Sequence, residues 1–314
     1  MKNKLFLLIV WIILITAIVV SGCDLHNHLI RKPDFTYSFD GNSAIITGYN
    51  GRDKHVNIPP EINQLPITQI GSYAFSDTRI KSITIPNSVT AIGIGAFSYC
   101  KSLKNITLPD NIKMIKAEMF KGCKKLTSIK IPNSVTVIQN SAFADTGLTT
   151  IVLPDGLIYI GHNAFRWSNL SSITIPNSII YIGDSVFSTN KHLTNINIPE
   201  GVTEIPFFTF ANCKNLMNII LPDSLLRIES QAFNETGLSK ITIPAGVTSI
   251  GSHAFLDCSK LSRVVMLSET PPKVNETSFS RTSSELQIEV PKVSVNVYKN
   301  SPGWSEYASR IVGY

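Results

Sequence analysis

The stretch that decides the fold is residues 103–123, LKNITLPDNIKMIKAEMFKGC. Its first part has the pattern Leu-x-x-Ile-x-Leu, with polar residues between the apolar ones. This alternation predicts a short strand with one buried face. Pro109 follows the strand and ends it, because proline cannot donate a hydrogen bond to a sheet.

The same motif recurs along most of the chain. It contains an apolar residue followed by proline, and it contains a phenylalanine, and both markers return every 22 or 23 residues after the first copy. Two independent markers with one period indicate a repeat architecture. The prolines are Pro59, Pro86, Pro109, Pro132, Pro154, Pro176, Pro199, Pro222 and Pro244. The phenylalanines, which we interpret as core markers, are Phe75, Phe97, Phe120, Phe143, Phe165, Phe187, Phe210, Phe233 and Phe255.

A single copy is too small to bury its own apolar residues. In one unit, Val89 and Ile92 are expected to point inward, Gly93 to turn the chain, and Ala96-Phe97 to fill the back of the coil. Stacked neighbours then form a continuous core. Parallel strands repeat at about 4.7–4.9 Å, so nine or ten rungs predict an elongated body of roughly 45 Å. Length alone favours two domains, but a solenoid grows without a new core.

One corner of the motif accounts for the two unit lengths. Units of 23 residues continue from the phenylalanine as in Phe97-x-x-Cys100, whereas units of 22 have a Thr-Gly pair such as Thr146-Gly147. Thr-Gly is typical of a turn, because glycine tolerates positive φ. The length change is therefore expected at this corner only.

Composition limits the function classes. The chain has 314 residues, 43% of them hydrophobic and 16% charged, which excludes wholesale disorder. Lys and Arg total 28 against 22 Asp and Glu, a formal charge of +6. A balance this mild, without runs of basic residues, is a weak argument for nucleic acid. Only the N-terminal apolar run is long enough to concern a membrane, which excludes a multi-span membrane protein.

The first 22 residues have the features of a secretory signal: two lysines, an apolar run at residues 5–20, and Ser21-Gly22 before Cys23. The Ser-Gly-Cys site resembles the lipobox of bacterial lipoproteins. By that resemblance, Cys23 carries a lipid and becomes the first residue of the mature chain. The alternative is an uncleaved anchor helix, for which the run is short. Both place the body outside the cytoplasm, held at a bacterial membrane, with residues 23–34 as a tether.

The repeat resembles the BspA-like, or Treponema pallidum type, leucine-rich repeat, with its pattern Leu-x-x-Ile-x-Ile-Pro-x-x-Val-x-x-Ile-Gly-x-x-Ala-Phe-x-x-Cys. The resemblance implies a right-handed leucine-rich repeat solenoid of stacked parallel strands, with short helical or 3-10 turns on the convex side. It also implies an N-terminal cap at 35–57, about nine repeats at 58–267, and a C-terminal cap at 268–314. The seventh unit departs from the pattern at Ile205-Pro206-Phe207-Phe208, which puts its turn in doubt.

The chain lacks the residue patterns of catalysis. It contains no Gly-x-Ser-x-Gly, His-Glu-x-x-His, P-loop or dinucleotide-binding pattern. We therefore predict no enzyme activity, no cofactor and no metal site. Four cysteines, Cys100, Cys123, Cys213 and Cys258, share one repeat position. Buried, inert thiols are the simplest interpretation. Since the compartment is oxidising, a bridge between Cys100 and Cys123, one rung apart, is the alternative.

Two outward strips are candidate binding surfaces. The first, on the concave sheet, carries short polar residues such as Asn105 and Thr107, and it lacks the Tyr and Trp of interface hot spots. The second lies between the Val and Ile of the motif. Its apolar members, with three large aromatics on neighbouring coil edges, form the predicted patch: Met114, Val137, Ile158, Tyr159, Ile180, Tyr181, Trp167, Phe207 and Phe208. Contiguous exposed apolar patches mark interfaces, although these side chains could instead cover one another.

Three functions are compatible with this sequence. The resemblance implies a lipid-anchored surface protein that binds another protein, such as a host matrix protein or a neighbouring cell. A carbohydrate or cell-envelope binding module would need a row of exposed aromatics on the first strip, which the sequence does not have. A structural surface component would self-associate. We expect contact with the membrane through the Cys23 lipid only, and no nucleic acid.

Overall fold

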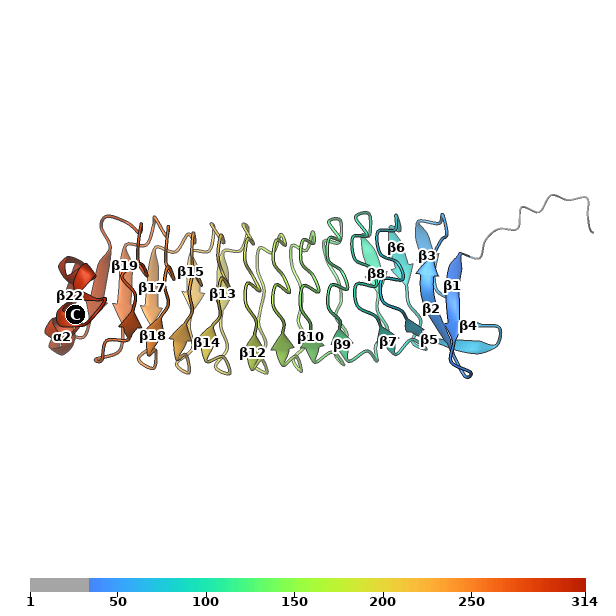
Figure 1. Ribbon diagram of the computed structural model, residues 1–314, viewed down its shortest axis with the longest axis horizontal. Helices are drawn as coiled ribbons and strands as arrows, with labels where there is room; N and C mark the ends of the chain where they lie inside the picture. The colour runs from blue at the N-terminus through green and yellow to red at the C-terminus, as the bar shows by residue number, and fades with distance from the viewer. Residues whose placement is uncertain (1–33) are drawn as a thin grey trace, which may run out of the picture. The chain divides into compact units, whose positions relative to one another are not determined.

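The computed structural model describes residues 34–314, and Phe35–Tyr314 form one compact unit (Figure 1). The predicted signal peptide, Cys23 and most of the tether lie outside the described residues. The unit is a solenoid of stacked coils, as the period of the sequence predicts. Each coil runs through two rows, in which most coils form short strands, and the described pairs within each row are parallel.

The first row follows the Leu-x-x-Ile-x-Leu part of the motif. It lies above the second row in Figure 1. Its strands are β3 (His55–Asn57), β6 (Ser82–Thr84), β8 (Asn105–Thr107), β13 (Asn195–Asn197), β15 (Asn218–Ile220), β17 (Lys240–Ile243), β19 (Arg263–Met266), β21 (Gln287–Val290) and β22 (Ile311–Gly313).

The second row follows the Val-x-x-Ile part, where the sequence analysis expected a returning segment. It too consists of paired strands, most of them two residues long. They are β2 (Ala44–Tyr49), β5 (Leu65–Ile70), β7 (Ala91–Ile92), β9 (Met114–Ile115), β10 (Val137–Ile138), β11 (Tyr159–Ile160), β12 (Tyr181–Ile182), β14 (Glu204–Ile205), β16 (Arg227–Ile228), β18 (Ser249–Ile250) and β20 (Lys273–Val274). At the N-terminal end, β1 (Phe35–Phe39) and β4 (Glu61–Ile62) pair antiparallel with β2 and β5.

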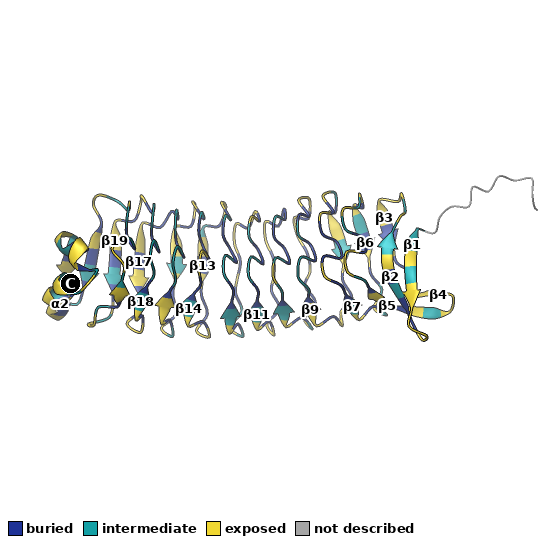
Figure 2. Ribbon diagram, viewed as in Figure 1, coloured by how far each residue is buried: buried dark blue, intermediate teal, exposed yellow. Residues whose placement is uncertain are grey.

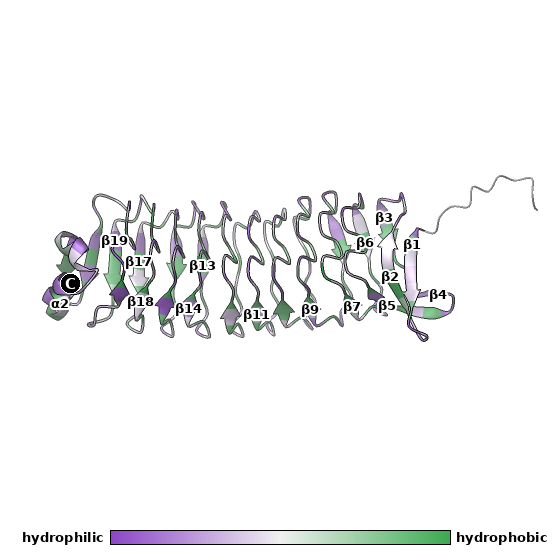
Figure 3. Cartoon of the chain, in the orientation of Figure 1, coloured by the Kyte–Doolittle hydropathy of each residue, from purple (hydrophilic) through white to green (hydrophobic). Residues whose placement is uncertain are grey.

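Alternation along the first row sorts buried from exposed side chains. Ile83, Ile196 and Ile241 are buried, whereas their neighbours Thr84, Asn197 and Thr242 are exposed. Figure 2 shows buried and exposed stretches alternating along the coils, and Figure 3 shows the same contrast as hydropathy. The predicted inward and outward faces of this strip are therefore confirmed.

The back of each coil is a chain of turns held by hydrogen bonds to the next coil. Around Phe97, for example, Gly95, Phe97 and Tyr99 donate their N–H groups to carbonyls of the following coil at 2.9, 3.0 and 2.6 Å. The residues two before and two after each phenylalanine have positive φ, which turns alternate N–H groups outward. In a helix, these N–H groups would donate to carbonyls of the same coil. Here they donate to the following coil, so the convex side has hydrogen-bonded turns in place of the expected helical turns. In the described part of the chain, the helices lie at the C-terminal end.

The nine marker phenylalanines are fully buried and stack one above the next. Ring centroids of consecutive members are 5.2–5.9 Å apart. The stack continues beyond them to Tyr49 at one end and to Phe279 at the other, at 5.4 and 5.1 Å. Coiling therefore extends past residue 267, through β20 and β21.

The seventh unit keeps the common turn despite Pro206-Phe207-Phe208. β14 pairs in register with β16, and Phe208 has the positive φ of its equivalents in other coils. The Thr209 hydroxyl donates to the Pro206 carbonyl at 2.7 Å, and Phe210 joins the stack. Pro206 occupies the place of Gly183 and Gly251, whose N–H groups donate to the preceding coil, so this coil lacks one hydrogen bond between coils and still keeps the turn.

The C-terminal end of the core is closed by η1 (Lys292–Ser294), α2 (Val295–Asn300) and η2 (Ser305–Arg310). Trp304, fully buried, donates its indole N–H to the Pro272 carbonyl at 2.7 Å. Tyr307 donates to the Glu276 carbonyl at 2.6 Å and packs edge-on against Phe279. A solenoid needs such a terminal cover, because its last coil has no neighbour.

Candidate functional site

The predicted patch lies largely on one sheet. Met114, Val137, Tyr159 and Tyr181 are the first residues of β9, β10, β11 and β12, and they face each other in register across the four strands. The second residue of each strand is a buried isoleucine, which fixes the direction of the first. We call Met114, Val137, Ile158, Tyr159, Ile180 and Tyr181 the second-row strip.

The most exposed members of the second-row strip precede the strands. Ile180 is 69% exposed and Ile158 is 41% exposed, and their backbones are joined by a 3.1 Å hydrogen bond from Ile180 to Ile158. Met114 is 38% exposed, while Val137 and both tyrosines are half-buried. Part of the strip thus covers itself, yet two adjacent isoleucines and a methionine remain open to solvent.

The two tyrosines form the rigid centre of the strip. The rings of Tyr159 and Tyr181 are stacked, with centroids 4.6 Å apart and planes inclined by 7°. Partial burial and the neighbouring Tyr159 raise the pKa of Tyr181. The Tyr181 phenol is therefore neutral at physiological pH. The two rings present flat apolar faces with polar tips, as interface tyrosines do.

A polar cluster at one end of the strip was missed by sequence reasoning. The Oη of Tyr181 lies 3.2 Å from His162 Nε2, and His162 Nδ1 accepts the backbone N–H of Asp184 at 3.0 Å. The Asp184 carboxylate is 3.2 Å from Nδ1. The repeat period contained this signal, since one unit of 22 residues after His162 is Asp184.

Two different surfaces border the strip. A hollow lies between its N-terminal coils, lined by Ala117, Val137, Gln139, Asn140, Ile158 and Tyr159. On the C-terminal side the second row becomes charged: Arg227 of β16 contacts both Glu204 and Glu229. In Figure 3 this change is visible as purple strands near β14 and β18. The strip is therefore a bounded apolar area.

The remaining members of the predicted patch lie apart from the strip. Trp167 is 51% exposed but follows the buried Phe165, on the far side of the back turn from β11. The guanidinium of Arg166 lies 4.0 Å from its ring centroid. Phe207 and Phe208 are exposed on the turn after β14, and Ser185 of the preceding coil donates its N–H to the Phe207 carbonyl. Among the described residues, no ring contact or side-chain hydrogen bond joins these three side chains to the strip.

The four repeat cysteines are free and buried. Each thiol donates to a phenylalanine carbonyl of the preceding coil: Phe75, Phe97, Phe187 and Phe233, at 3.0–3.2 Å. Burial raises the pKa of Cys213 to about 12 and those of Cys100 and Cys258 to about 11. Asn190 occupies the same place and donates to the Phe165 carbonyl at 2.8 Å. These side chains tie neighbouring coils together.

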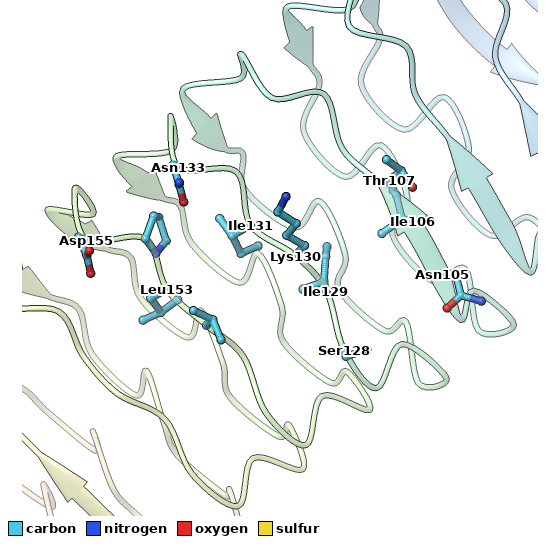
Figure 4. Close-up of a pocket in the computed structure, with 12 residues that line it drawn as sticks. Asn105, Ile106, Thr107, Ser128, Ile129, Lys130, Ile131, Asn133, Leu153 and Asp155 are labelled. Atoms are coloured by element: carbon cyan, nitrogen blue, oxygen red, sulfur yellow. The ribbon is translucent and has the colours of Figure 1, made fainter.

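The first row of strands is interrupted in the middle of the solenoid. At residues 128–131, 150–153 and 172–175 the chain runs in the row without forming strands, apart from one bridge between Lys130 and Val152. A hollow lies here, and Figure 4 shows the polar side chains of Asn105, Thr107, Lys130 and Asn133 around it. The described outward positions of this row carry no aromatic residue.

Within residues 34–314, no group of three or more His, Cys, Asp or Glu side chains is arranged to hold a metal ion. No helix in this part of the chain has the length and apolar character needed to cross a membrane.

Comparison with known proteins identifies the family. The protein-family model described as “BspA type Leucine rich repeat region (6 copies)” matches residues 68–194 and 180–302. The chain therefore belongs to the BspA-type leucine-rich repeat family, as its repeat motif predicted. No curated protein matches the chain.

A solved structure agrees with this assignment. A leucine-rich repeat protein from Bacteroides ovatus is 28% identical, with a TM-score of 0.77, and the match covers 84% of this chain and 71% of that one. The T. pallidum leucine-rich repeat protein is 27% identical over 62% of this chain and 84% of its own, with a TM-score of 0.48. Pneumococcal antigen PcpA is 15% identical over 90% and 96%, with a TM-score of 0.47.

Proposed function

We propose that this chain is an extracytoplasmic, lipid-anchored scaffold that binds another protein through the second-row strip. Leucine-rich repeat solenoids are typically scaffolds rather than catalysts, since each coil contacts only its neighbours and the stack presents long surfaces. The binding is passive: it needs no cofactor and no reaction. Cys23 supplies the anchor in this proposal, and residues 23–34 supply the tether.

The observation that carries the proposal is the exposure of Ile158 and Ile180 beside the stacked pair Tyr159 and Tyr181. Adjacent exposed isoleucines cost solubility, and contiguous apolar patches of this kind are found at protein interfaces. Tyrosine is enriched among the residues that contribute most to binding, because it buries a large rigid surface at low entropic cost. The backbone beneath is held by parallel pairing, so the surface is preorganised.

The test uses the chain from residue 24 onward, which retains the whole compact unit Phe35–Tyr314. Immobilised chain is probed with extracellular-matrix proteins, with glycans and with itself. We expect saturable binding of a protein, and a loss of about tenfold or more in the double variant Tyr159→Ser, Tyr181→Ser. The matched control is Tyr73→Ser, Tyr99→Ser, which removes two exposed tyrosines outside the strip and is expected to bind normally.

Three results would reject this proposal. The first is a folded double variant at positions 159 and 181 that keeps every binding activity. The second is self-association in sedimentation experiments with no other protein bound, which would indicate a structural surface component. The third is binding confined to glycans.

A further inference from the structure

Positive charge is concentrated in one part of the solenoid. Residues 79–130 contain ten Lys and Arg but only two Asp and Glu, whereas the remainder of the chain contains 18 and 20. The mild net charge of the whole chain therefore hides a strongly basic segment. Because it spans consecutive coils, its side chains recur at the same places along the stack.

Six exposed cations line the corner that leads into the first row. We call them the cation edge: Lys54, Arg79, Lys81, Lys101, Lys104 and Lys125. Lys54, Lys81 and Lys104 are directly stacked, since Lys81 donates its N–H to the Lys54 carbonyl at 2.6 Å and Lys104 to the Lys81 carbonyl at 2.8 Å. In later coils this position is neutral, as at Thr127, Thr149 and Ser171.

The members of the cation edge are not paired with carboxylates. Among the described residues, none of its six members forms an ion pair, although nearby Lys124 reaches Asp145 at 3.3 Å. In the C-terminal half, by contrast, some cations are paired across coils, as Lys214 is with Glu235 at 2.9 Å and Arg281 with Asp257 at 2.8 Å. Like charges directly opposite on neighbouring strands are destabilising. An anionic ligand would relieve this repulsion.

We propose that the cation edge binds a linear anionic polysaccharide bearing sulfate or carboxylate groups. Rungs at about 4.7–4.9 Å place the three stacked lysines in a line along the solenoid axis, which suits an extended polyanion. The polar hollow of Figure 4 starts one residue after Lys104, and Asn105, Thr107 and Ser128 there can exchange hydrogen bonds with sugar hydroxyls. Recognition of the polysaccharide depends on charge, so it does not require exposed aromatic residues along the first row.

Two other polyanions fit less well. Single-stranded nucleic acids are bound by aromatic side chains stacked on bases, and the outward first-row positions have none. A lipid surface is flat and engages cations spread over a face, whereas these cations are confined to one edge beside a hollow. The experiment therefore includes a nucleic acid and an anionic lipid surface as competing ligands.

The probe is a fluorescent heparin-derived oligosaccharide, and its dissociation constant is measured by anisotropy across a series of NaCl concentrations. The variant Lys54→Thr, Lys81→Thr, Lys104→Thr uses the residue that later coils have at this place. We expect affinity near physiological salt to fall by about 100-fold, and the log–log salt slope to fall by about three. The control, Lys240→Thr, Lys260→Thr, Lys273→Thr, changes net charge equally on exposed lysines elsewhere and is expected to lose less than about threefold.

A third variant, Lys54→Arg, Lys81→Arg, Lys104→Arg, separates charge from folding, and it is expected to retain affinity within about threefold. Equal losses in the two threonine variants would overturn the proposal, since net charge alone would then explain binding. No binding by the native chain would also overturn it. So would tighter binding of length-matched DNA, or of vesicles containing phosphatidylglycerol, than of the oligosaccharide. None of these outcomes concerns the second-row strip.

Discussion

The rings of Tyr159 and Tyr181 stack at 4.6 Å because the two residues are register partners in adjacent parallel strands. Their separation in sequence is one repeat, so the contact is a direct product of the period. Register pairing in adjacent parallel strands brings two such side chains close enough for their rings to stack.

The tyrosine pair should contribute a measurable coupling energy. In a double-mutant cycle with Tyr159→Ala and Tyr181→Ala, we expect an interaction of about 0.5–1.5 kcal/mol, typical of stacked aromatic pairs. The measurement is urea unfolding followed by circular dichroism. Tyr181→Phe keeps the ring and loses only the contact with His162, so its stability should change by less than about 1 kcal/mol. A coupling energy of zero would mean that the stack is incidental.

Gly147 should be intolerant of a side chain for a reason that differs from the sequence prediction. The Thr146-Gly147 pair was expected to use a positive φ at glycine, but the positive φ in this corner belongs to Asp145. Gly147 is instead required by close approach, since an added Cβ would press against the backbone carbonyl oxygen of Lys124. We expect Gly147→Ala to destabilise the chain by about 1–3 kcal/mol.

The matched control is Gly156→Ala, where an added Cβ would meet no atom within 4 Å. It should change the free energy of unfolding by less than about 0.5 kcal/mol. Thermal and urea unfolding of the two variants side by side make the comparison. Equal effects would contradict the steric explanation of the shorter coils.

Most of the fold could be predicted from the sequence, because the period is repeated many times and each copy supports the others. The phenylalanine spacing alone predicts a stack of rings, and the stack is present. The back turns could not be predicted, because polar residues such as Glu118 and Gln231 adopt positive φ only when the next coil accepts their N–H groups.

The candidate surfaces were predicted less completely. The register positions of Met114 to Tyr181 follow from the period, but their exposure depends on how neighbouring side chains cover them. Trp167 illustrates the limit: it is exposed as expected, yet it lies beyond the buried Phe165 and away from the strip. The cluster of Lys54, Lys81 and Lys104 was not predicted, because these residues are far apart in sequence and become neighbours only when the chain coils.

Burial of Cys213 should make stability depend on alkaline pH. Its pKa is raised from 9.0 to about 12 by desolvation, so the folded chain keeps the thiol proton where the unfolded chain loses it. This contribution is complete below pH 9 and is lost as pH rises toward 12. Each such thiol lowers the free energy of unfolding by about 1.4 kcal/mol per pH unit within that window.

The variant Cys213→Ala isolates this contribution. The slope of unfolding free energy against pH, measured in urea between pH 9 and 10.5, should be shallower than in the native chain by about 1.4 kcal/mol per pH unit. Below pH 8 both slopes should agree. If the slope above pH 9 is the same in Cys213→Ala and in the native chain, the Cys213 thiol ionises while the chain stays folded.

Cys23 is predicted to hold the chain at a membrane. In a bacterial host, the native chain should sediment with membranes, and its N-terminal peptide should carry the mass of acyl chains. Cys23→Ser should release it or leave the signal uncleaved, because serine cannot form the thioether. Cys100→Ser is the control, since that thiol is buried in the solenoid. A native chain whose N-terminal peptide carries no acyl chains would favour an uncleaved anchor helix.

Loss of the C-terminal cover should unfold the solenoid locally. Trp304→Ala removes a fully buried ring and its hydrogen bond to Pro272, at a cost of about 3–5 kcal/mol. Because each coil contacts only its neighbours, the loss should spread no further than the adjoining coils. Hydrogen exchange should therefore accelerate in β19 and β21 while β8 keeps its native protection. Uniform acceleration along all coils would show that the stack unfolds as a single cooperative unit and that its end is held no differently from its middle.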